Sequence, residues 1–370
     1  MTLQGKGFYI WKIKDCENGD ANQIANIAKA AGLSHVLIKI ADGIYTYNYD
    51  WNKRVDLVPP VANALRARGI KVWGWHYLYG DNPSKEASIA VQRIKGLNLD
   101  GYVLDVEHQY KEPGKATAAK TFMRDLRNGI GNNVPVALSS YRFPSLHPIP
   151  WNEFLEKCDY NMPQVYWMGA HNPGSQLART LNEFASLKYK PPIIPTGAAF
   201  TEHGWTPTTQ DVQEFLVTAR SFNLSAANFW EWWNARDVLT PKHQIWNVIA
   251  DYDWAGGGAQ DITAKYIEAL NSHDYNKVAE FYTENAVHVT AARTIVGKAR
   301  IRGWYRSFFS SLLPNGIFTL TGFSGSGNSR HLTWSARSST GNVNNGNDTF
   351  GLIDDKITYH YLHYTISKSH

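Results

Sequence analysis

The chain has 370 residues, enough for two domains, and 43% of them are hydrophobic, yet no apolar stretch is long enough to span a membrane. The first twenty residues lack the apolar run and cleavage site of a signal peptide, and nothing else in the sequence indicates a compartment. The net charge of +5 comes from Lys and Arg spread along the chain, and Cys16 and Cys158 belong to no metal-spaced cluster, so we expect no nucleic-acid partner, no membrane partner, no metal and no organic cofactor.

Short apolar runs alternate with helix-like segments over the first 250 residues or so. Several of the helix-like segments end in Gly, which is a common helix stop. The rhythm predicts an α/β fold, a (β/α)8 TIM barrel, and the alternative is a doubly wound open sheet. The eight runs expected to be strands cover residues 7–13, 35–41, 71–79, 101–107, 134–141, 160–168, 191–200 and 226–233.

A change of composition predicts the domain boundary. Twelve of the 14 Trp residues precede residue 255, and "DWAGGGAQD" (253–261) then places three glycines in a row. Gly-rich segments hold a fixed backbone poorly, which makes them common linkers. We therefore expect a barrel at 1–254 and a second domain at 255–370.

The second domain is expected to have an α+β fold. Ile262, Tyr266, Ile267 and Leu270 follow the spacing of one amphipathic helix, and the apolar residues of 278–282 follow that of a second. After residue 316 the pattern becomes that of alternating strands. This order predicts helices first and an antiparallel sheet after them.

Two carboxylates end the fourth expected strand, "GYVLDVE" (101–107). Alternate strand residues share a face, so Asp105 and Glu107 point the same way, with Cα atoms about 6.6–6.8 Å apart, while Leu104 and Val106 face the helices. Barrel active sites form at this end of the strands. Two close carboxylates resist ionising together, which predicts Glu107 as a general acid and Asp105 as its modulator. The alternative is a pair of solvated charges, or an ion pair with Lys39.

Aromatic residues gather at the ends of the same runs. Pyranose rings stack on flat aromatic faces, and large exposed aromatics are rare without a use. This pattern predicts a polysaccharide as the partner. The residues concerned are Trp11, Trp75, Tyr77, Tyr141, Tyr166, Trp167, Trp230, Trp232 and Trp233.

The first half resembles two families of glycan hydrolases. "VLIKIADG" (36–43), "GWHYLYGDNPSKEA" (74–87) and "YVLDVE" (102–107) are similar to successive strand signatures of family 25 lysozymes, and "DGYVLDVE" (100–107) is similar to the family 18 chitinase-type signature. The resemblance covers about 230 residues. It implies hydrolysis of a β-linked N-acetylhexosamine polysaccharide, peptidoglycan or chitin, with Glu107 as the acid and Asp105 orienting the substrate acetamide.

Further residues enter through the same resemblance. His76 matches a strand-three His of family 25, and Gln164, in "NMPQVYWMG" (161–169), stands where family 18 usually has Tyr. The segment "ANFWEWWN" (227–234) resembles the strand-eight Trp region and contributes Trp230, Glu231 and Trp232. The chain departs from the two family patterns at two positions. Val103 replaces the middle Asp of the family 18 signature. Strand one lacks the Asp that family 25 places at its end, and Asp15 lies further along the loop.

Other interpretations of the first half remain open. Asp42 either bonds sugar hydroxyls at the barrel mouth or starts a turn with Gly43. Glu202 in "AAFTEHGW" is either an exposed charge or the nucleophile of a retaining glycosidase whose acid is Glu107. A protein from another class, a carbohydrate-binding or scaffolding barrel with weak or no catalysis, fits the same aromatic pattern.

The second half resembles a different fold family. "YIEALNSHDYNKVAEFYTENAVHV" and "GKARIRGWYRSFF", both within 266–309, are similar to the opening of the cone-shaped fold shared by nuclear transport factor 2 and the SnoaL group. The resemblance covers about 105 residues. It implies one of two roles for this domain. The first is dimerisation, which would make the whole chain a homodimer. The second is ligand binding in a pocket lined by His288, Trp304, His331 and Tyr361.

Overall fold

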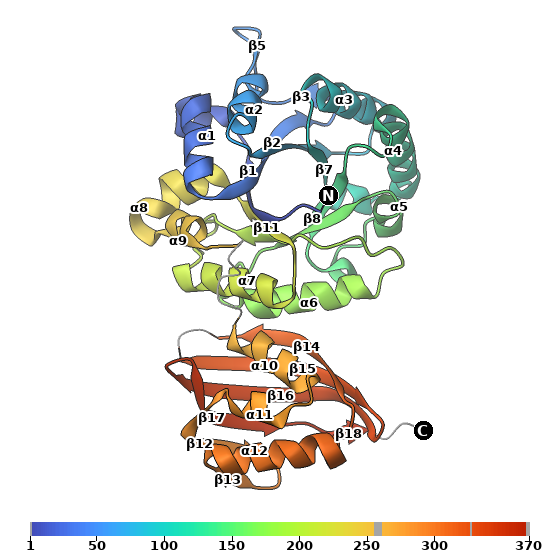
Figure 1. Ribbon diagram of the computed structural model, residues 1–370. Coiled ribbons are helices and arrows are strands. Elements are labelled where there is room, and N and C mark those ends of the chain that lie inside the picture. Colours follow the sequence, from blue (N-terminus) through green and yellow to red (C-terminus); the bar gives the residue numbers. More distant parts are fainter. Residues whose placement is uncertain (1, 255–260, 326–327, 368–370) are drawn as a thin grey trace. The chain divides into compact units, whose positions relative to one another are not determined.

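The computed structural model describes residues 2–254, 261–325 and 328–367 (Figure 1). The chain divides into two compact units, Met1–Ala219 with Leu224–Gly256, and Gly257–His370 with Arg220–Asn223. The boundary predicted at residue 255 lies outside the described residues.

The first unit is a closed barrel of eight parallel strands, as predicted (Figure 1). Each strand pairs in parallel with its neighbour in the chain, and β1 closes the ring by pairing with both β2 and β11. Each of the eight expected runs overlaps one of these strands. They are β1 (Gly5–Ile10), β2 (Leu33–Asp42), β6 (Lys71–Leu78), β7 (Gly101–Val106), β8 (Val136–Tyr141), β9 (Tyr160–Val165), β10 (Thr196–Ala198) and β11 (Ala226–Trp230).

Helices connect the strands and surround the barrel. Local signals start several of them: the Asp20 side chain accepts from the backbone N–H groups of Asn22 and Gln23 at the start of α1, and Pro83 opens α3. The helices are α1 (Ala21–Ala30), α2 (Val58–Arg66), α3 (Pro83–Gly96), α4 (Lys115–Ile130), α5 (Trp151–Leu155), α6 (Pro173–Ala185), α7 (Thr209–Ser221), α8 (Thr240–His243) and α9 (Ile245–Asp251), with a π-helical segment at Asn234–Leu239.

Shorter strands and helical turns lie in the loops at the rim of the barrel. The two-residue strand β3 (Tyr45–Thr46) pairs with the end of β2, and β4 (Tyr49–Asp50) pairs with β5 (Val55–Asp56) in a small hairpin. Single turns of 3-10 helix follow strand ends at Ile13–Asp15, Glu17–Gly19, His108–Lys111 and Pro144–Leu146.

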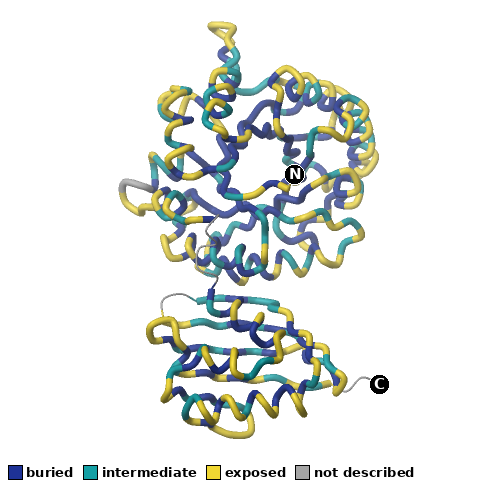
Figure 2. Tube along the Cα trace, viewed as in Figure 1, coloured by how far each residue is buried: buried dark blue, intermediate teal, exposed yellow. Residues whose placement is uncertain are grey.

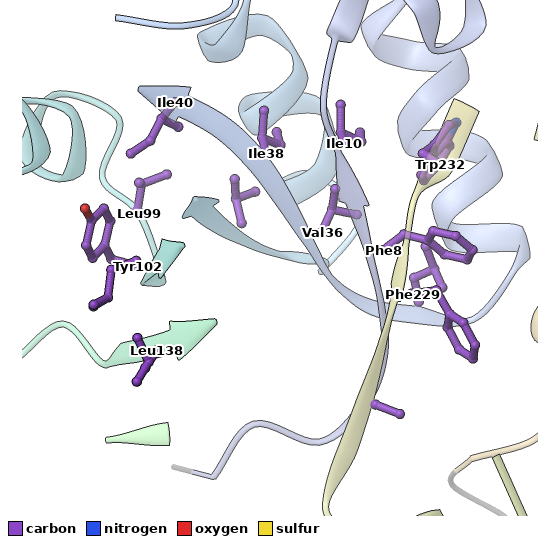
Figure 3. Close-up of a cluster of buried hydrophobic side chains, with 14 of the residues drawn as sticks. Phe8, Ile10, Val36, Ile38, Ile40, Leu99, Tyr102, Leu138, Phe229 and Trp232 are labelled. Atoms are coloured by element: carbon purple, nitrogen blue, oxygen red, sulfur yellow. The ribbon is translucent and has the colours of Figure 1, made fainter. Parts of the chain in front are cut away.

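Strand alternation divides the buried side chains of the barrel into two layers. Figure 3 shows the outer layer, where Phe8, Ile10, Val36 and Ile38 project from β1 and β2 toward the helices. Their neighbours face the barrel interior, where a second buried cluster includes residues of seven strands. Figure 2 shows the barrel strands as largely buried. That inner cluster contains Leu3, Tyr9, Leu37, Trp73, Trp75, Val103, Ala137, Tyr160, Met162, Ile194 and Ala226.

The second unit packs helices against one mixed sheet with its own buried core. The sheet runs in the order β13-β12-β17-β16-β15-β14, and β12 lies parallel to β17. Its elements are α10 (Ile262–Asn271), α11 (Tyr275–Ala279), β12 (Tyr282–Thr290), β13 (Thr294–Val296), α12 (Lys298–Ser307), a π-helical segment at Phe308–Leu312, β14 (Ile317–Ser324), β15 (Ser329–Ser338), β16 (Gly341–Ile353), β17 (Lys356–His363) and β18 (Ile366–Ser367).

The predicted order of helices before strands is wrong in one respect. The hairpin of β12 and β13 precedes α12, so two strands lie among the helices. The second helix ends at Ala279, and Tyr282 already begins β12, where "AVHVT" supplies the β-branched residues that favour a strand. Within the described residues, no helix is long and apolar enough to cross a membrane.

Candidate active site at the carboxyl end of the barrel

Asp105 and Glu107 lie at the carboxyl end of β7, on the side that strand alternation predicts. Val103 belongs to the cluster inside the barrel, whereas Leu104 and Val106 belong to the layer under the helices. Asp105 is the penultimate residue of β7, and Glu107 follows the strand with an extended backbone. The two side chains therefore face the barrel axis at its carboxyl end.

Gln164 on β9 joins the two carboxyl groups. Its Nε2 donates to Oε1 of Glu107 at 2.7 Å and to Oδ1 of Asp105 at 3.1 Å. Because one amide nitrogen contacts both groups, the carboxylates are close neighbours in space as well as in sequence. Ser139, which pairs with Asp105 across β7 and β8, lies 3.5 Å from the same nitrogen.

Burial raises the pKa of both carboxyl groups. For Asp105 burial moves the pKa well above its usual range, the charge of Glu107 adds to the shift, and the Lys39 ammonium opposes it. For Glu107 burial raises the pKa to about 7, and the hydrogen bond from Gln164 opposes the shift. The Glu107 side chain is still 22% exposed, so it is accessible from solvent. At neutral pH the pair therefore retains a proton that can be transferred.

Aromatic rings line the interior next to the pair. Trp230 is central among them: its ring centroid lies 5.2 Å from that of Trp75, 5.6 Å from that of Tyr9 and 6.2 Å from that of Trp11. The Trp75 indole donates to the carbonyl of Ile10, which fixes its orientation. Trp11 is 41% exposed, while Tyr9 and Trp75 are buried. The group offers aromatic faces at the barrel mouth.

Asp42 and Tyr77 lie at the same end of the barrel. The Lys39 ammonium bonds Asp42 at 2.5 Å, and the hydroxyl of Tyr79 donates to the other carboxylate oxygen at 2.9 Å. Lys39 thus forms its ion pair with Asp42, and acts on Asp105 through its charge. Tyr77 pairs with Asp105 across β6 and β7 and donates its hydroxyl to Gln109 at 2.9 Å. Burial raises the pKa of Tyr77 to about 12.

His76 lies outside this group, although the sequence predicts it as a substrate contact. Its neighbours Trp75 and Tyr77 face the interior, so alternation turns His76 toward the helices. It is fully buried there, with Nε2 2.7 Å from the carbonyl of Gly43 and Nδ1 2.8 Å from the hydroxyl of Tyr102. Burial lowers the pKa of His76 to about 4. The side chain has a structural place in the outer layer, and the prediction for it is corrected.

Trp232 lies away from the carboxylate pair, and Glu231 follows the carboxyl end of β11. Trp232 is fully buried in the outer layer, where its ring meets that of Phe8 at 6.1 Å (Figure 3). Glu231 is buried, and its carboxylate accepts from the backbone N–H and the side-chain amide of Asn234, at 2.9 and 3.0 Å. Burial raises the pKa of Glu231. The bonds to Asn234 show that Glu231 caps the helical segment after β11. The prediction of a substrate contact is corrected for Trp232, and for Glu231 it stays a prediction.

Glu202 and Tyr166 follow the ends of β10 and β9. The Glu202 side chain is 51% exposed, lies 3.6 Å from His203, and belongs to a turn closed by backbone pairing with Trp205. Tyr166 is partly buried and packs edge-on against Phe200, with centroids 5.1 Å apart. No interaction among the described residues connects the Glu202 carboxylate to Glu107.

The structure adds neighbours of the pair that the sequence does not single out. Tyr9 and Ser139 face the interior beside Asp105, a placement that strand alternation predicts once the barrel is accepted. His147, in the loop after β8, has its Nε2 4.0 Å from Oε2 of Glu107, and its ring stacks on Tyr141. Burial lowers the pKa of His147 to about 4, so the imidazole is neutral at neutral pH. No local pattern marks this loop residue.

A second group of buried polar side chains lies inside the second unit. The Tyr282 hydroxyl is 2.8 Å from that of Tyr305 and 2.6 Å from Nδ1 of His360, whose Nε2 lies 3.4 Å from Asp348. His288 stacks on His360 with centroids 4.3 Å apart. Burial raises the pKa of Asp348 to about 7 and lowers those of His288 and His360 to about 2 and about 3.

Of the four residues predicted to line a pocket in this unit, His288 and Trp304 lie at that group of buried polar side chains. His288 is fully buried and its ring meets that of Trp304 at 4.6 Å. Tyr361 is 40% exposed, and His331 is partly buried with Nδ1 3.2 Å from Thr349. Among the described residues, no group of three His, Cys, Asp or Glu side chains is arranged to hold a metal ion.

A comparison with protein-family models found a match within the second unit. Residues 263–360 match the SnoaL-like domain model, and the comparison with curated proteins found no match for the chain. The protein is thus of mixed α/β class, with a closed eight-stranded parallel barrel and a C-terminal nuclear transport factor 2-like domain.

Three of the solved structures that resemble the chain match between 28% and 30% of it. An NTF2-like protein of unknown function from Cytophaga hutchinsonii is 13% identical, with a TM-score of 0.25, and the match covers 28% of this chain and 87% of that one. A putative ketosteroid isomerase from Kribbella flavida is 14% identical, with a TM-score of 0.26, covering 30% and 78%. An epoxide hydrolase from M. tuberculosis is 15% identical, with a TM-score of 0.25, covering 28% and 80%.

Proposed function

We propose that the protein is a glycoside hydrolase that cleaves a β-linked N-acetylhexosamine polysaccharide, such as peptidoglycan or chitin, with Glu107 as general acid. The observation that carries the proposal is the pair Asp105 and Glu107, joined by Gln164, with pKa values raised by burial. A carboxylic acid that keeps its proton near neutral pH is what protonation of a glycosidic oxygen needs. The resemblance of "YVLDVE" (102–107) to glycan hydrolase signatures supports the same assignment.

In the proposed reaction Glu107 gives its proton to the glycosidic oxygen as the bond from that oxygen to the anomeric carbon breaks. The carboxylate of Asp105, or the carbonyl oxygen of the substrate's own acetamide, attacks the anomeric carbon as that bond breaks and forms a bond that water displaces in the second step. Water then adds to the anomeric carbon and returns a proton to Glu107, which acts as base in this second step. The product keeps its configuration, because the anomeric carbon is attacked twice.

The aromatic wall supports a saccharide as the substrate. Beside the carboxylate pair the Trp230 ring lies 5.2 Å from that of Trp75 and 6.2 Å from that of Trp11, and Trp11 is well exposed. Asp42 and Tyr77 add polar groups at the same rim. A few placed polar groups among aromatic rings are typical of sites that orient a ligand.

Two alternatives use parts of the same site. A glycan-binding protein without catalysis needs only the aromatic wall and the polar rim. A retaining glycosidase with Glu107 as acid and Glu202 as nucleophile is less well supported, because the Glu202 side chain is half exposed in a turn and contacts His203.

The test that separates an enzyme from a binding protein is a comparison of turnover with thermal protection. We expect the full-length chain to release new reducing ends from peptidoglycan and from chitin oligomers. If instead the oligomers raise its melting temperature and no bond is cleaved, the binding alternative is right and the hydrolase proposal is wrong.

We also propose that the second unit mediates a homodimer. Tyr359 and Tyr361 on β17 are 43% and 40% exposed, and Ile353 at the end of β16 is 54% exposed. Partly apolar sheet surface of this kind is a common element of subunit interfaces.

A further inference from the structure

A groove opens beside the candidate active site on the same rim of the barrel. It has a volume of about 320 Å³, and Lys12, Lys14, Tyr47, Tyr49 and Trp51 are among the residues that line it. Its walls are the segment after β1 and the segment between β2 and α2, both of which follow carboxyl ends of barrel strands. Substrates of barrel enzymes bind at this end, and the volume is at the low end of the roughly 300–1,000 Å³ of ligand sites.

The groove is continuous with the aromatic wall of the candidate site. The Tyr47 ring lies 4.3 Å from the Lys39 ammonium, and the same ammonium lies 4.7 Å from the ring of Trp75. Trp75 in turn packs against Trp230. A chain of contacts thus leads from the groove to the wall beside the carboxylate pair.

Hydrogen bonds hold the two walls together before any ligand arrives. The Asn48 side chain accepts from the backbone N–H of Ile13 at 2.8 Å and donates to the carbonyls of Trp11 and Lys39, at 3.0 and 2.8 Å. Asp50 accepts from the Lys14 ammonium at 3.1 Å, which ties the hairpin of β4 and β5 to the first wall. A site that is organised in advance loses less entropy on binding.

The groove combines exposed aromatic faces with ammonium groups. The Tyr49 and Trp51 rings lie 4.6 Å apart, and Trp51 is 68% exposed on the hairpin labelled β5 in Figure 1, which extends from the barrel and has an exposed tip in Figure 2. The side chains of Lys12 and Lys14 are 50% and 61% exposed. An indole so exposed indicates a binding role, and its neighbours indicate an anionic ligand.

Among the side chains that line the groove, two cations, Lys12 and Lys14, accompany one carboxylate, Asp15. The exposed hairpin turn adds Lys53 and Arg54. The other carboxylates of the two segments are already bound within the protein: they are Asp50, which pairs with Lys14, Glu17, which pairs with Arg236, Asp56, which pairs with Arg93, and Asp20, which caps α1. The ion pair between Lys14 and Asp50 leaves the Lys12 ammonium, 4.0 Å from Asp15, as the more weakly paired of the two lining cations.

We propose that this groove is an accessory subsite for a carboxylate-bearing sugar of the polysaccharide. The pyranose ring lies on the Tyr49 and Trp51 faces, and the carboxylate points toward Lys12. The inference rests on the proposed function and deepens it, because it makes an acidic glycan the preferred substrate over a neutral one. A neutral glycan would use the rings and leave the Lys12 ammonium with only its 4.0 Å contact to Asp15.

Calorimetric binding to the full-length Glu107→Gln protein tests the subsite without cleavage. The ligands are a soluble glycan strand whose alternate sugars bear a carboxylate, and the same strand with those carboxylates amidated. We expect Trp51→Ala to weaken binding of the acidic strand about tenfold and Lys12→Gln about threefold. The amidated strand should bind more weakly than the acidic one and be insensitive to Lys12→Gln.

Matched exposed residues outside the groove serve as controls. Tyr45→Ala removes a ring that is 65% exposed on β3, and Lys29→Gln removes an exposed ammonium on α1, and neither should change binding. Unchanged binding in both Trp51→Ala and Lys12→Gln, equal affinity for the two strands, or no binding by the parent protein overturns the inference.

The outcome is separable from that of the proposed function. If the wild type cleaves glycans while the groove variants bind normally, the subsite is wrong and the hydrolase stands. If the wild type cleaves nothing while the variants lose affinity as expected, the subsite stands in a binding protein.

Discussion

At the scale of single residues, the environment of Glu107 decides what the site can do. A Glu in water ionises well below neutral pH, whereas burial raises the pKa of Glu107 to about 7 and that of Asp105 well above its usual range. Gln164 contacts both groups, and its amide donor favours the ionised form of Glu107. The site therefore holds a proton-donating carboxyl, and one neighbouring amide adjusts its pKa.

The pH dependence of hydrolysis follows from this environment. Ionised Glu107 cannot protonate a leaving oxygen, so kcat/KM should fall as the pH rises through about 7. Gln164→Leu removes the donor that lowers the pKa of Glu107, so this alkaline limb should move to higher pH. Initial rates measured from about pH 4 to about 9 check both statements. A limb near the ordinary pKa of Glu, or one that Gln164→Leu leaves in place, would contradict them.

His288 gives the second unit a pH dependence of its stability. Burial lowers the pKa of His288 from 6.5 to about 2, with the neighbouring His360 adding to the shift. The unfolded chain thus binds a proton that the folded chain excludes, so the contribution is complete above about pH 6.5 and is lost as the pH falls. Asp348, whose pKa is raised to about 7, has the opposite effect, which is lost as the pH rises from its ordinary value of 3.8 toward 7.

His288→Phe isolates the histidine contribution, because Asp348 and His360 are present in both proteins. Between about pH 4 and about pH 6.5 we expect the free energy of opening β17 to rise less steeply with pH in the variant than in the wild type. The difference in slope corresponds to at most one proton taken up on opening. Hydrogen exchange of β17 peptides in the full-length protein measures it. Identical slopes in variant and wild type would show that His288 does not titrate on opening.

At the scale of elements, the barrel was predictable because its signal repeats. All eight apolar runs overlap strands, and the alternation around Asp105 and Glu107 places both on the interior face. The same alternation excludes His76 from the interior once Trp75 and Tyr77 face it. The prediction that all three consecutive residues share one face of the strand was therefore wrong, because successive side chains point to opposite faces. His147 was not predictable, because it lies in a loop without periodicity.

The buried group of the second unit illustrates a different limit. Its members come from separate elements: Tyr282 from β12, Tyr305 from α12, Asp348 from β16 and His360 from β17. No short motif connects these positions, and only the pairing of the strands brings them together. Sequence patterns report local periodicity, while contacts of this kind depend on tertiary packing.

Packing at the amino ends of the strands supplies a test of the barrel itself. A Cβ added at Gly101, the first residue of β7, would lie 2.3 Å from ring atoms of the buried Trp73. Gly101→Ala should lower the unfolding free energy by about 1–3 kcal/mol. Gly96→Ala, at the end of α3 where a Cβ meets open space, should be neutral or slightly stabilising. Calorimetry of both variants checks the difference, and equal stability would contradict the packing around Trp73.

At the scale of the whole molecule, the chain joins a barrel with a candidate glycan site to a nuclear transport factor 2-like unit. The barrel carries the carboxylate pair, and the second unit carries a buried polar group and an exposed sheet surface. The proposed homodimer would link two barrels through their second units. Such a protein would present two glycan sites to one polymer, which raises its apparent affinity.

Light scattering of the full-length protein tests this assembly. We expect twice the chain mass of 41.7 kDa. The double variant Tyr359→Glu, Tyr361→Glu should shift the protein toward the monomer, because it places charge on the proposed interface. Val296→Glu, at a residue 51% exposed on β13, is the matched control and should leave the mass unchanged. A monomeric wild type at high concentration would contradict the dimer.

The central claim is that Glu107 donates the proton in glycan hydrolysis, and one comparison tests it most directly. Initial rates of reducing-end release are measured for the wild type, for Glu107→Gln and for Glu202→Gln on the same peptidoglycan and chitin substrates. The account predicts that Glu107→Gln lowers kcat by about 100-fold or more, while Glu202→Gln stays close to the wild type. Full activity in Glu107→Gln would contradict the assignment, and a comparable loss in both variants would favour a retaining enzyme with Glu202 as nucleophile.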